Sequence, residues 1–421
     1  MRPVLRCLAT SFGSSGDFLP TLAIASALGR RGHAVTFIAN PTYASRVARA
    51  RVTFAPAGER LDIFARIEQT PAYTDAANAG MLFRDFVEPD TEAGYRVASE
   101  QLRSAAFDVA LTSDVSFGAA WAAAERGVPI VLVTASPVLW MSWASPAFFG
   151  DGPIRTALAA PLTVAGRSFM RWYVSRRLRP LARRVGTSLA DVSAHAWERQ
   201  TALHLGVWSP ALRAPVAGDP PTGRICGYTR ASALAGTAPG LAPQVEAFLD
   251  DGPPPVVVGL GSVVGRTVGP LLVQLAEACA DVGRRCLIVG HPAGITFPPG
   301  TLAVPDAPYD RVFPRAAAVV VHGGSGTTGE ALRSGRPIVG MPVAYDQFTL
   351  CEWVERLGVG VRVPIARRSQ RHLAHALERV LSDAGMRERV ARAGARFAAE
   401  PDGAEVAADE IERLVVGRTA P

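Results

Sequence analysis

The sequence has 421 residues, of which 48% are hydrophobic, 40 are glycine and 33 are proline, and its formal net charge is +7. This length exceeds what one hydrophobic core usually serves and the composition excludes extensive disorder, so we expect two domains of roughly 200 residues each. The basic residues are all arginine, which indicates coding bias, and the absence of any helix-turn-helix, zinc-finger or aromatic–basic strand pattern argues against a nucleic-acid partner.

The N-terminal segment predicts a strand, a glycine loop, a helix and a second strand. Val4–Thr10 is apolar, residues 13–17 read Gly-Ser-Ser-Gly-Asp, Leu19–Arg31 has apolar residues at helical spacing, and Ala34–Ile38 is again apolar. This order is typical of a βαβ unit. Because the opening apolar stretch soon breaks into Gly and Ser, we expect neither a signal peptide nor a membrane span there.

The same alternation continues along the chain. A strand is expected at Val109–Thr112, a helix through Trp121–Arg126 and a strand at Pro129–Val133, followed by helical excursions between Pro137 and Pro210. After a stretch rich in Pro, Gly and Ala, further strands are expected at Pro255–Leu260, Arg285–Val289, Ala316–Val321 and Pro337–Met341.

Strand–helix alternation of this kind predicts an α/β protein with two doubly wound parallel sheets. We expect an N-terminal domain over residues 1–228, a C-terminal domain over 229–395, and a final helix over 396–421 that packs back towards the N-terminal domain. In open parallel sheets, ligands bind beyond the carboxyl ends of the strands, so the functional residues are sought there.

The cysteines and histidines indicate no metal site and no disulfide. The five cysteines are odd in number and form no Cys-x-x-Cys pair, so we interpret them as small buried hydrophobes in a reducing, cytoplasmic compartment. The histidines show no ligand spacing, and no metal or other cofactor is expected.

The most informative run reads VVVHGGSGTTGEALRSGRPIVGMPVAYDQ from Val319 to Gln347. It places His322 at the end of a strand, then Gly324, Ser325, Gly326 and Thr327, and a helix is expected to begin near Gly329. Backbone N–H groups at a helix N-terminus favour an anion, and glycines allow a pyrophosphate to approach closely. The run therefore predicts a diphosphate site.

A dinucleotide oxidoreductase is the main alternative. Gly324, Gly326 and Gly329 satisfy the GxGxxG spacing, and Asp346 follows Gly326 by 20 residues, where a ribose-binding acid could lie. However, NAD requires no histidine before the glycines, and Asp346 lies several residues beyond its strand. A purely structural glycine turn is the other alternative, and nucleotide-sugar binding is favoured over both.

At these residues the sequence resembles the family 1, UDP-glucuronosyltransferase-like glycosyltransferases. The resemblance rests on the run from His322 through Glu330 to Asp346-Gln347, on the N-terminal GSSGD loop, on Gly259-Leu-Gly261-Ser262, and on Ser136-Pro137. It extends from the first strand to at least Gly360 and is closest to the bacterial rhamnosyltransferase and sterol glucosyltransferase type.

The resemblance implies a GT-B fold with an acceptor-binding N-terminal domain, a donor-binding C-terminal domain and catalysis in the cleft. It implies that the diphosphate is bound by His322, Gly324, Ser325, Gly326 and Thr327, and also by Ser262 from a facing strand. Ribose would be bound by Glu330, and the sugar by Asp346 and Gln347.

Two positions depart from the family pattern. Val321 stands where many members have a first histidine, and Asp306 stands where many stack the base on Trp or Tyr. The identity of the base, uracil or thymine, is therefore left open.

Inverting glycosyl transfer needs a base that takes the proton of the acceptor hydroxyl. Asp17 occupies the first loop, and a partly buried carboxylate with a raised pKa could serve, although Asp17 could also act only as a helix N-cap. The resemblance also implies a catalytic role for Asp114, at the end of the strand VALTSD, where relatives with a histidine base have an orienting acid. Two neighbouring carboxylates, however, repel unless one is protonated.

Candidate acceptor-binding residues are Trp140, Trp143 and Phe148, although they could equally be core. Seven arginines between Arg167 and Arg184 alternate with Phe169, Met170, Trp172, Tyr173 and Leu178. This segment predicts either a helix resting on the anionic inner face of a membrane or a solvated helix whose aromatic face packs on the core. The second interpretation is favoured.

The sequence therefore predicts an inverting glycosyltransferase that moves a hexose or deoxyhexose from a UDP- or dTDP-sugar to a small apolar acceptor such as a lipid or natural product. A non-catalytic nucleotide-sugar-binding subunit is a further alternative. A monomer or a homodimer is expected.

Overall fold

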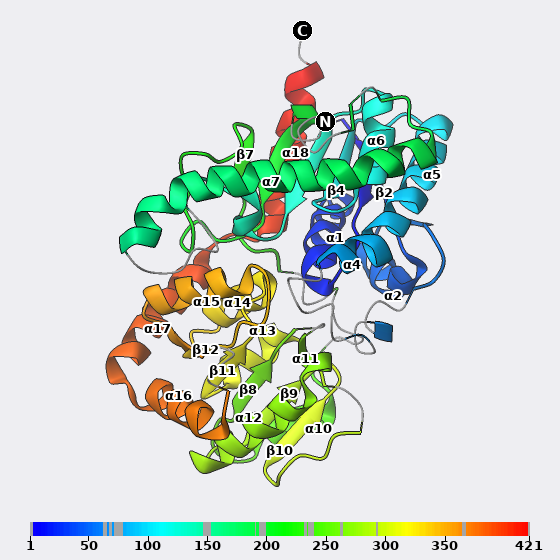
Figure 1. Ribbon diagram of the computed structural model, residues 1–421. Helices are drawn as coiled ribbons and strands as arrows, with labels where there is room; N and C mark the ends of the chain where they lie inside the picture. The colour runs from blue at the N-terminus through cyan, green and yellow to red at the C-terminus, as the bar shows by residue number, and fades with distance from the viewer. Residues whose placement is uncertain are drawn as a thin grey trace. The chain divides into compact units, whose positions relative to one another are not determined.

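The computed structural model describes residues 3–61, 65–66, 70, 79–145, 153–189, 191–192, 199–230, 234, 240–261, 264–291, 294–363 and 368–419. These residues form two compact units, drawn in Figure 1. The N-terminal unit contains Met1–Ile63, Ala79–Leu234 and Pro401–Pro421, and the C-terminal unit is formed mainly of Ala235–Glu400.

The N-terminal unit is built on a parallel sheet with the strand order β3-β2-β1-β4-β5-β6-β7. Its strands are β1 (Arg6–Thr10), β2 (Ala34–Ala39), β3 (Thr53–Pro56), β4 (Val109–Ser113), β5 (Ile130–Thr134), β6 (Thr201–Gly206) and β7 (Gly223–Ile225). Its helices include α1 (Ser15–Arg30), α2 (Ala44–Val47), α4 (Ala79–Leu82), α5 (Glu88–Ser104), α6 (Phe117–Glu125), α7 (Pro153–Val185) and α18 (Gly403–Thr419).

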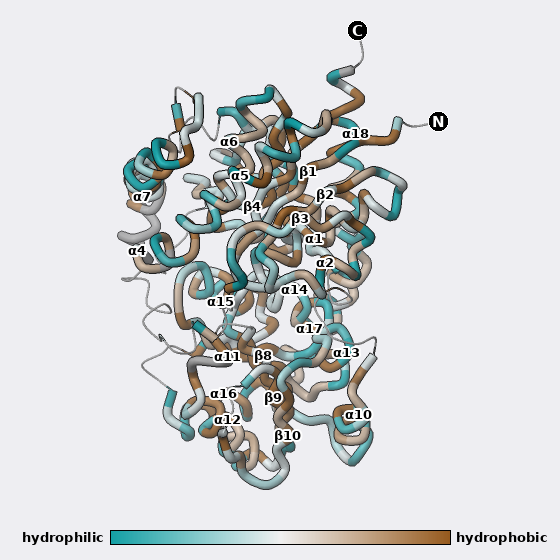
Figure 2. Tube along the Cα trace, turned by 90° about the vertical axis from the view of Figure 1, so that its right-hand side faces the viewer, coloured by the Kyte–Doolittle hydropathy of each residue, from teal (hydrophilic) through white to brown (hydrophobic). Residues whose placement is uncertain are grey.

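The helices of this unit pack in two groups, α5 against α6 and α7, and α1 against α18. Every residue of β4 and β5 is buried, which explains why these strands are continuous apolar runs in the sequence. In Figure 2 the hydrophobic residues run along the strands, and the outer helices carry the hydrophilic ones.

The C-terminal unit contains a second parallel sheet, with the strand order β10-β9-β8-β11-β12-β13. Its strands are β8 (Val256–Gly259), β9 (Cys286–Val289), β10 (Thr301–Val304), β11 (Ala318–Val321), β12 (Ile338–Gly340) and β13 (Gly360–Arg362). Its helices include α10 (Pro243–Asp250), α11 (Val264–Thr267), α12 (Gly269–Asp281), α13 (Tyr309–Val312), α14 (Ser325–Arg333), α15 (Gln347–Arg356), α16 (Gln370–Ser382) and α17 (Ala384–Ala399).

The predicted fold class is confirmed, because both units are doubly wound parallel sheets. Of the strands that the sequence did not predict, β3, β7, β10 and β13 are short or lie at the sheet edges. The exception is β6, a six-residue strand inside the sheet, where the sequence wrongly predicted only helical excursions. All five cysteines are buried and free.

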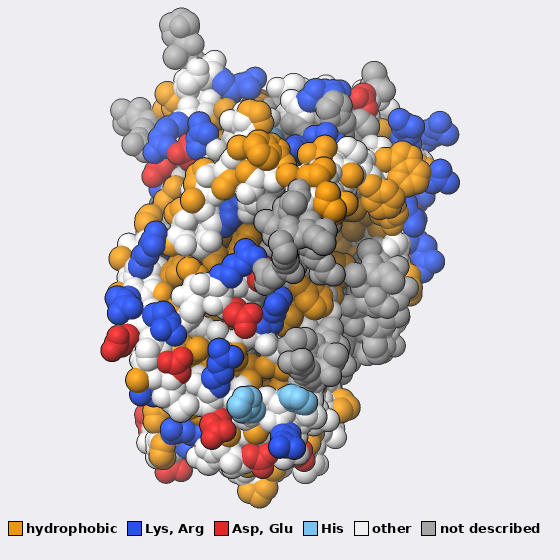
Figure 3. Space-filling view, turned by 60° about the vertical axis from the view of Figure 1, so that its left-hand side comes forward, with side chains coloured by type: hydrophobic (Ala, Val, Ile, Leu, Met, Phe, Trp, Pro, Cys, Tyr) orange, Lys and Arg blue, Asp and Glu red, His pale blue; other side chains and the backbone are white. Residues whose placement is uncertain are grey.

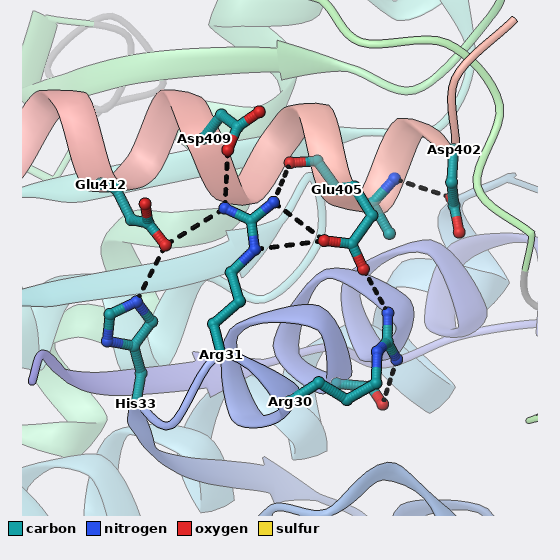
Figure 4. Close-up of polar contacts among 9 residues, drawn as sticks. Arg30, Arg31, His33, Asp402, Glu405, Asp409 and Glu412 are labelled. Atoms are coloured by element: carbon teal, nitrogen blue, oxygen red, sulfur yellow. Dashed lines mark hydrogen bonds and ion pairs between the residues drawn. The ribbon is translucent and has the colours of Figure 1, made fainter.

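The last helix, α18, is tied to the end of α1 by a network of charged side chains (Figure 4). Arg31 donates to the Glu405 carboxylate at 2.8 Å, to Asp409 at 2.7 Å and to Glu412 at 3.1 Å. His33 Nδ1 accepts from the Leu5 backbone, so its Nε2 carries the proton donated to Glu412 at 3.0 Å. One half-buried guanidinium thus joins three carboxylates of α18 to the first βαβ unit.

Candidate active site

Each sheet has one topological switch point, where the strand order reverses from one side of the sheet to the other. In the N-terminal unit it lies between β1 and β4, and in the C-terminal unit between β8 and β11. Ligands of open parallel sheets bind outside the carboxyl ends of the strands at this point. The residues singled out from the sequence lie here: Asp17 and Asp114 follow β1 and β4, and Gly261 and His322 follow β8 and β11.

In the C-terminal unit, the glycine turn is shorter and its helix begins earlier than predicted. Helix α14 starts at Ser325 with Gly324 as its N-cap, whereas the sequence placed the start near Gly329. Ser325, Gly326 and Thr327 therefore form the first helical turn, and their N–H groups precede the first i→i−4 bond, which Thr328 donates to Gly324. No side chain caps this end among the described residues, and no acidic residue lies in the first turn. An anion would complete it.

Three buried polar atoms at this turn have no hydrogen-bond partner within the described part of the chain. They are His322 Nδ1, Ser325 Oγ and Thr328 Oγ1. An unsatisfied buried polar atom costs about 1–3 kcal/mol, so a partner for each of these three, such as a ligand or a water, would be stabilising. A hydroxyl or an imidazole N–H can each donate to a phosphate oxygen. The turn thus combines exposed Gly326 with donors that no other described residue satisfies.

The imidazole of His322 is held between two glycines. A Cβ at Gly261 would lie 2.5 Å from His322 Cε1, and a Cβ at Gly324 would lie 2.4 Å from His322 Nε2. Gly261 also has a φ of +73°. No other residue fits either position while the ring stays in place. Burial lowers the pKa of His322 to about 4, so at neutral pH the ring is uncharged and acts as a hydrogen-bond donor rather than as a cation.

Tyr309 is a residue of this site that the sequence did not identify. Its ring stacks on Phe313 with centroids 4.5 Å apart and covers Gly259, whose Cβ would lie 2.9 Å from it. Burial raises the pKa of Tyr309, while a hydrogen bond to the Gly261 backbone opposes this and the charge of nearby Asp306 adds to it. The glycine pair at the end of β8, Gly259 and Gly261, could have indicated that large rings pack there, because any Cβ at these positions would clash with them. Asp306 is exposed at the end of the β10 segment.

The three residues expected to bind ribose and sugar are placed in different ways. Glu330 is half-buried on α14 and pairs with Arg333 one turn later. Asp346 is half-buried at the N-cap of α15, beyond the end of β12 at Gly340. A dinucleotide fold would place its ribose-binding acid at the strand end.

The side-chain oxygen of Gln347, the third of these residues, is already occupied. Its Oε1 already accepts from Val343 N at 2.8 Å and from Ala344 N at 3.0 Å, which holds the loop before α15. Only its Nε2, a donor, remains for a ligand. Ser262 lies outside the described residues.

In the N-terminal unit, Asp17 belongs to the first turn of α1. The N-cap is Ser14 and not Asp17: Asp17 stands at N3 of a capping box, where its Oδ2 accepts from Ser14 N at 3.0 Å and from Ser14 Oγ at 2.8 Å. Gly13 has a φ of +110°, and a Cβ there would lie 2.8 Å from Asp17 Oδ2. The loop is further fixed by a hydrogen bond from the Tyr43 hydroxyl to the Gly13 carbonyl.

Asp17 and Asp114 form an interacting carboxyl pair. Burial raises the pKa of Asp17, with the hydrogen bonds from Ser14 acting in the opposite direction. Burial also raises the pKa of Asp114, to about 7; the hydrogen bond from Thr134 Oγ1 lowers it and the charge of Asp17 raises it. Below about pH 7 Asp114 therefore holds its proton, which lessens the repulsion that the sequence led us to expect between the two carboxyls.

Two of the three aromatic candidates for the acceptor site are described, and their environments differ. Trp140, in the 3₁₀ turn η6 (Pro137–Trp140), is 5% exposed and packs edge-on against Trp208 with centroids 4.6 Å apart, so it is a core residue. Trp143 is 48% exposed and lies over Gly218. Phe148 lies outside the described residues.

Two absences concern only the residues that the structure describes. Among them, no group of three or more His, Cys, Asp or Glu side chains could hold a metal ion. Within the same part of the chain, every helix is too short or too polar to cross a membrane.

Known proteins resemble this chain along its whole length. Residues 290–413 match the family described as erythromycin biosynthesis protein CIII-like, C-terminal domain. The chain is 29% identical to O-mycaminosyltylonolide 6-deoxyallosyltransferase of Streptomyces fradiae, covering 99% of each chain, and 29% identical to glycosyltransferase GtfE of Amycolatopsis orientalis, covering 85% of each.

Solved structures share the fold. The calicheamicin glycosyltransferase CalG4 superimposes with a TM-score of 0.73 at 23% identity, covering all of both chains. The glycosyltransferase VinC, solved in complex with dTDP, superimposes with a TM-score of 0.70 at 19% identity over 98% of this chain and 100% of its own. Two doubly wound units with sites at their switch points, together with these relatives, define a glycosyltransferase of the GT-B fold. In sequence and in fold the chain is similar to family 1-like natural-product glycosyltransferases.

Proposed function

We propose that this enzyme transfers a hexose or deoxyhexose, with inversion, from a dTDP-sugar to a hydroxyl of an apolar polyketide-type acceptor. In this proposal the C-terminal unit binds the donor and the N-terminal unit binds the acceptor. The observation that carries it is the uncapped first turn of α14, with unpartnered donor atoms on His322, Ser325 and Thr328.

The leaving diphosphate is the group that this turn suits. During transfer, negative charge develops on the β-phosphate, and donors already oriented towards it stabilise that charge without reorganisation. The helix N-terminus contributes N–H groups and a partial positive charge, and neutral His322 contributes one N–H. Thymidine diphosphate is chosen over UDP because the glycosyltransferases VinC and SpnG have been solved with it.

Asp17 is the proposed base. Its carboxylate is half-buried, and burial raises its pKa above that of an ordinary aspartate, which makes it a better proton acceptor. Burial raises the pKa of neighbouring Asp114 to about 7, so below that pH Asp114 adds little negative charge beside Asp17, and Thr134 positions Asp114. The base takes the acceptor proton as the oxygen attacks the anomeric carbon, and the electron pair of the broken C–O bond leaves with the diphosphate.

An apolar acceptor is proposed from the relatives. One relative is named for a glycosylated macrolide lactone and others are named sterol 3-beta-glucosyltransferases, which are proteins acting on large apolar molecules. A nicotinamide-dependent reaction has no support among the relatives, and Asp346 lies in the wrong place for it. A cytoplasmic enzyme, monomeric or homodimeric, remains part of the proposal.

Asp17→Asn tests the catalytic assignment. The asparagine Oδ1 can accept the same two hydrogen bonds from Ser14, so the helix cap and the melting temperature should be kept. Turnover of dTDP-sugar with an accepted aglycone should fall by about 10²–10⁴-fold, while the affinity for dTDP stays unchanged. As a control, Asp383→Asn alters the cap of α17, whose Asp383 accepts from Met386 N, and should leave turnover unchanged. Full turnover by Asp17→Asn would exclude Asp17 as the base.

A further inference from the structure

The longest helix of the N-terminal unit, α7, exposes several of its large apolar residues. Phe169 is 58% exposed, Trp172 is 57% exposed and Leu158 is 50% exposed. The sequence favoured the opposite, with the aromatic residues packed on the core. The residues that α7 does bury are others, such as Leu178 and Leu181, both fully buried. Figure 1 shows α7 lying across the outside of its unit.

The exposed residues form one continuous line along the helix. They recur at alternating steps of four and three, the spacing that keeps side chains on one face of an α-helix. In order they are Leu158, Leu162, Ala165, Phe169, Trp172, Arg176, Arg179 and Arg183, and each is exposed. We call this line the α7 stripe. Its first part is apolar and its last part is arginine.

The charge of α7 has one sign. The helix contains eight arginines and no acidic residue over 33 positions. Acidic residues of α5 face only its flank, where Glu88 and Glu92 pair with Arg184 and Glu88 also pairs with Arg177. Within the described residues, the stripe arginines Arg176, Arg179 and Arg183 form no ion pair. Arg176 instead lies over the Trp172 ring at 5.9 Å.

These observations identify the chemistry that would cover the stripe. A contiguous exposed apolar surface marks an interaction site. A second copy of the chain is a poor occupant, because antiparallel α7 helices would place arginines on apolar residues and parallel helices would place arginines on each other. The surface that would complement the stripe offers apolar groups and closely spaced negative charges side by side. Aromatic residues beside arginines on an exposed helix face are typical of helices that lie in the interface of an anionic bilayer.

We propose that the α7 stripe docks the enzyme on the surface of an anionic membrane. The apolar part of α7 enters the boundary between headgroups and acyl chains, and Arg176, Arg179 and Arg183 bind lipid phosphates. At 1.5 Å per residue the helix is roughly 50 Å long, which suits a contact along the membrane plane. In Figure 3 hydrophobic side chains gather on the upper right of the face, with Lys and Arg side chains along its edge.

Membrane docking would place the enzyme where the apolar acceptor of the proposed function collects. An apolar acceptor concentrates in the bilayer, and an enzyme bound there meets it at a higher local concentration than in solution. Docking does not depend on the identity of the donor. It is therefore measured without any sugar nucleotide, so that its failure leaves the transfer reaction untouched.

Vesicle sedimentation tests the proposal directly. The full-length protein is mixed with vesicles of phosphatidylglycerol and phosphatidylcholine in equal parts, or of phosphatidylcholine alone. We expect binding to the anionic vesicles only, weakened by salt. Phe169→Ser with Trp172→Ser should weaken this binding at least tenfold. Arg176→Gln, Arg179→Gln and Arg183→Gln together should weaken it on the order of a hundredfold.

Matched controls separate docking from net charge and from folding. Val416→Ser removes an exposed apolar residue of α18, and Arg103→Gln, Arg371→Gln and Arg396→Gln together remove three exposed arginines elsewhere. Both controls should bind vesicles within twofold of the wild type, and all variants should keep their melting temperature and their transfer rate with a soluble acceptor. The proposal is overturned if the wild type binds neither vesicle, if it binds neutral vesicles equally well, or if the stripe variants bind like the controls.

Discussion

The carboxyl pair at the switch point of the N-terminal unit makes stability depend on pH in a predictable way. The pKa of Asp114 is raised from 3.8 to about 7, chiefly by burial. Between those pH values the unfolded chain has lost this proton and the folded chain still holds it, so the folded state becomes less stable as pH rises. About three pH units correspond to about 4 kcal/mol at most, since one unit is worth 1.36 kcal/mol.

Asp114→Asn removes this penalty. The asparagine Oδ1 still accepts from Thr134 Oγ1, so the substitution mainly deletes the charge. We compare the free energy of unfolding of the variant with that of the wild type at each pH. The variant's advantage should be about 2–4 kcal/mol larger at pH 8 than at pH 4. For a domain of this size that gain corresponds to roughly 5–10 °C in melting temperature.

Differential scanning calorimetry at several pH values from 4 to 8 measures this gain. Asp108→Asn is the control, because Asp108 is exposed and also accepts one hydrogen bond, from Arg6 N at 2.7 Å. Its melting temperature should follow the wild type throughout. Parallel curves for Asp114→Asn and the wild type, or a gain that grows towards low pH, would refute a buried, protonated Asp114.

The other predictions concern packing at the switch point of the C-terminal unit and the charged network at α18. Gly324→Ala should displace His322 and weaken dTDP binding at least tenfold by calorimetry, whereas Gly417→Ala, whose new Cβ meets no atom within 4 Å, should bind normally; equal affinities would show that the contact does not matter. Arg31→Ala breaks the network with three carboxylates and should cost about 2 kcal/mol in urea unfolding, against less than about 1 kcal/mol for the more exposed Arg30→Ala. Equal costs would mean that the network adds nothing to the single pair.

The alternation of apolar strands and amphipathic helices was sufficient to predict the fold. Strands buried on both faces, such as β4 and β5, appear as unbroken apolar runs, and glycines mark the turns that follow them. The positions of the site residues followed from the same logic, because strand ends of a parallel sheet meet at one edge. Short edge strands such as β7 have too few residues to show a recognisable hydrophobic pattern in the sequence.

The parts that could not be predicted depend on tertiary contacts. The start of α14 was placed too late because Ser325–Thr328 looks like a polar loop, and only the structure shows those residues in helical conformation. Gln347 looked like a sugar ligand, but its carbonyl is used by the backbone of its own loop. The exposure of Phe169 and Trp172 was also hidden, since the periodicity of a helix shows that one face is apolar and does not show what lies against it.

The cradle at the start of α14 is tested most directly by calorimetric titration of dTDP and thymidine into the wild type and Ser325→Ala. Because Ser325 Oγ is buried and has no hydrogen-bond partner among the described residues, its loss should leave the melting temperature equal or higher while weakening dTDP binding about 10–100-fold. Thymidine should bind far more weakly than dTDP to both proteins. Equal binding of thymidine and dTDP, or unchanged dTDP affinity in Ser325→Ala, would contradict a diphosphate held at this turn.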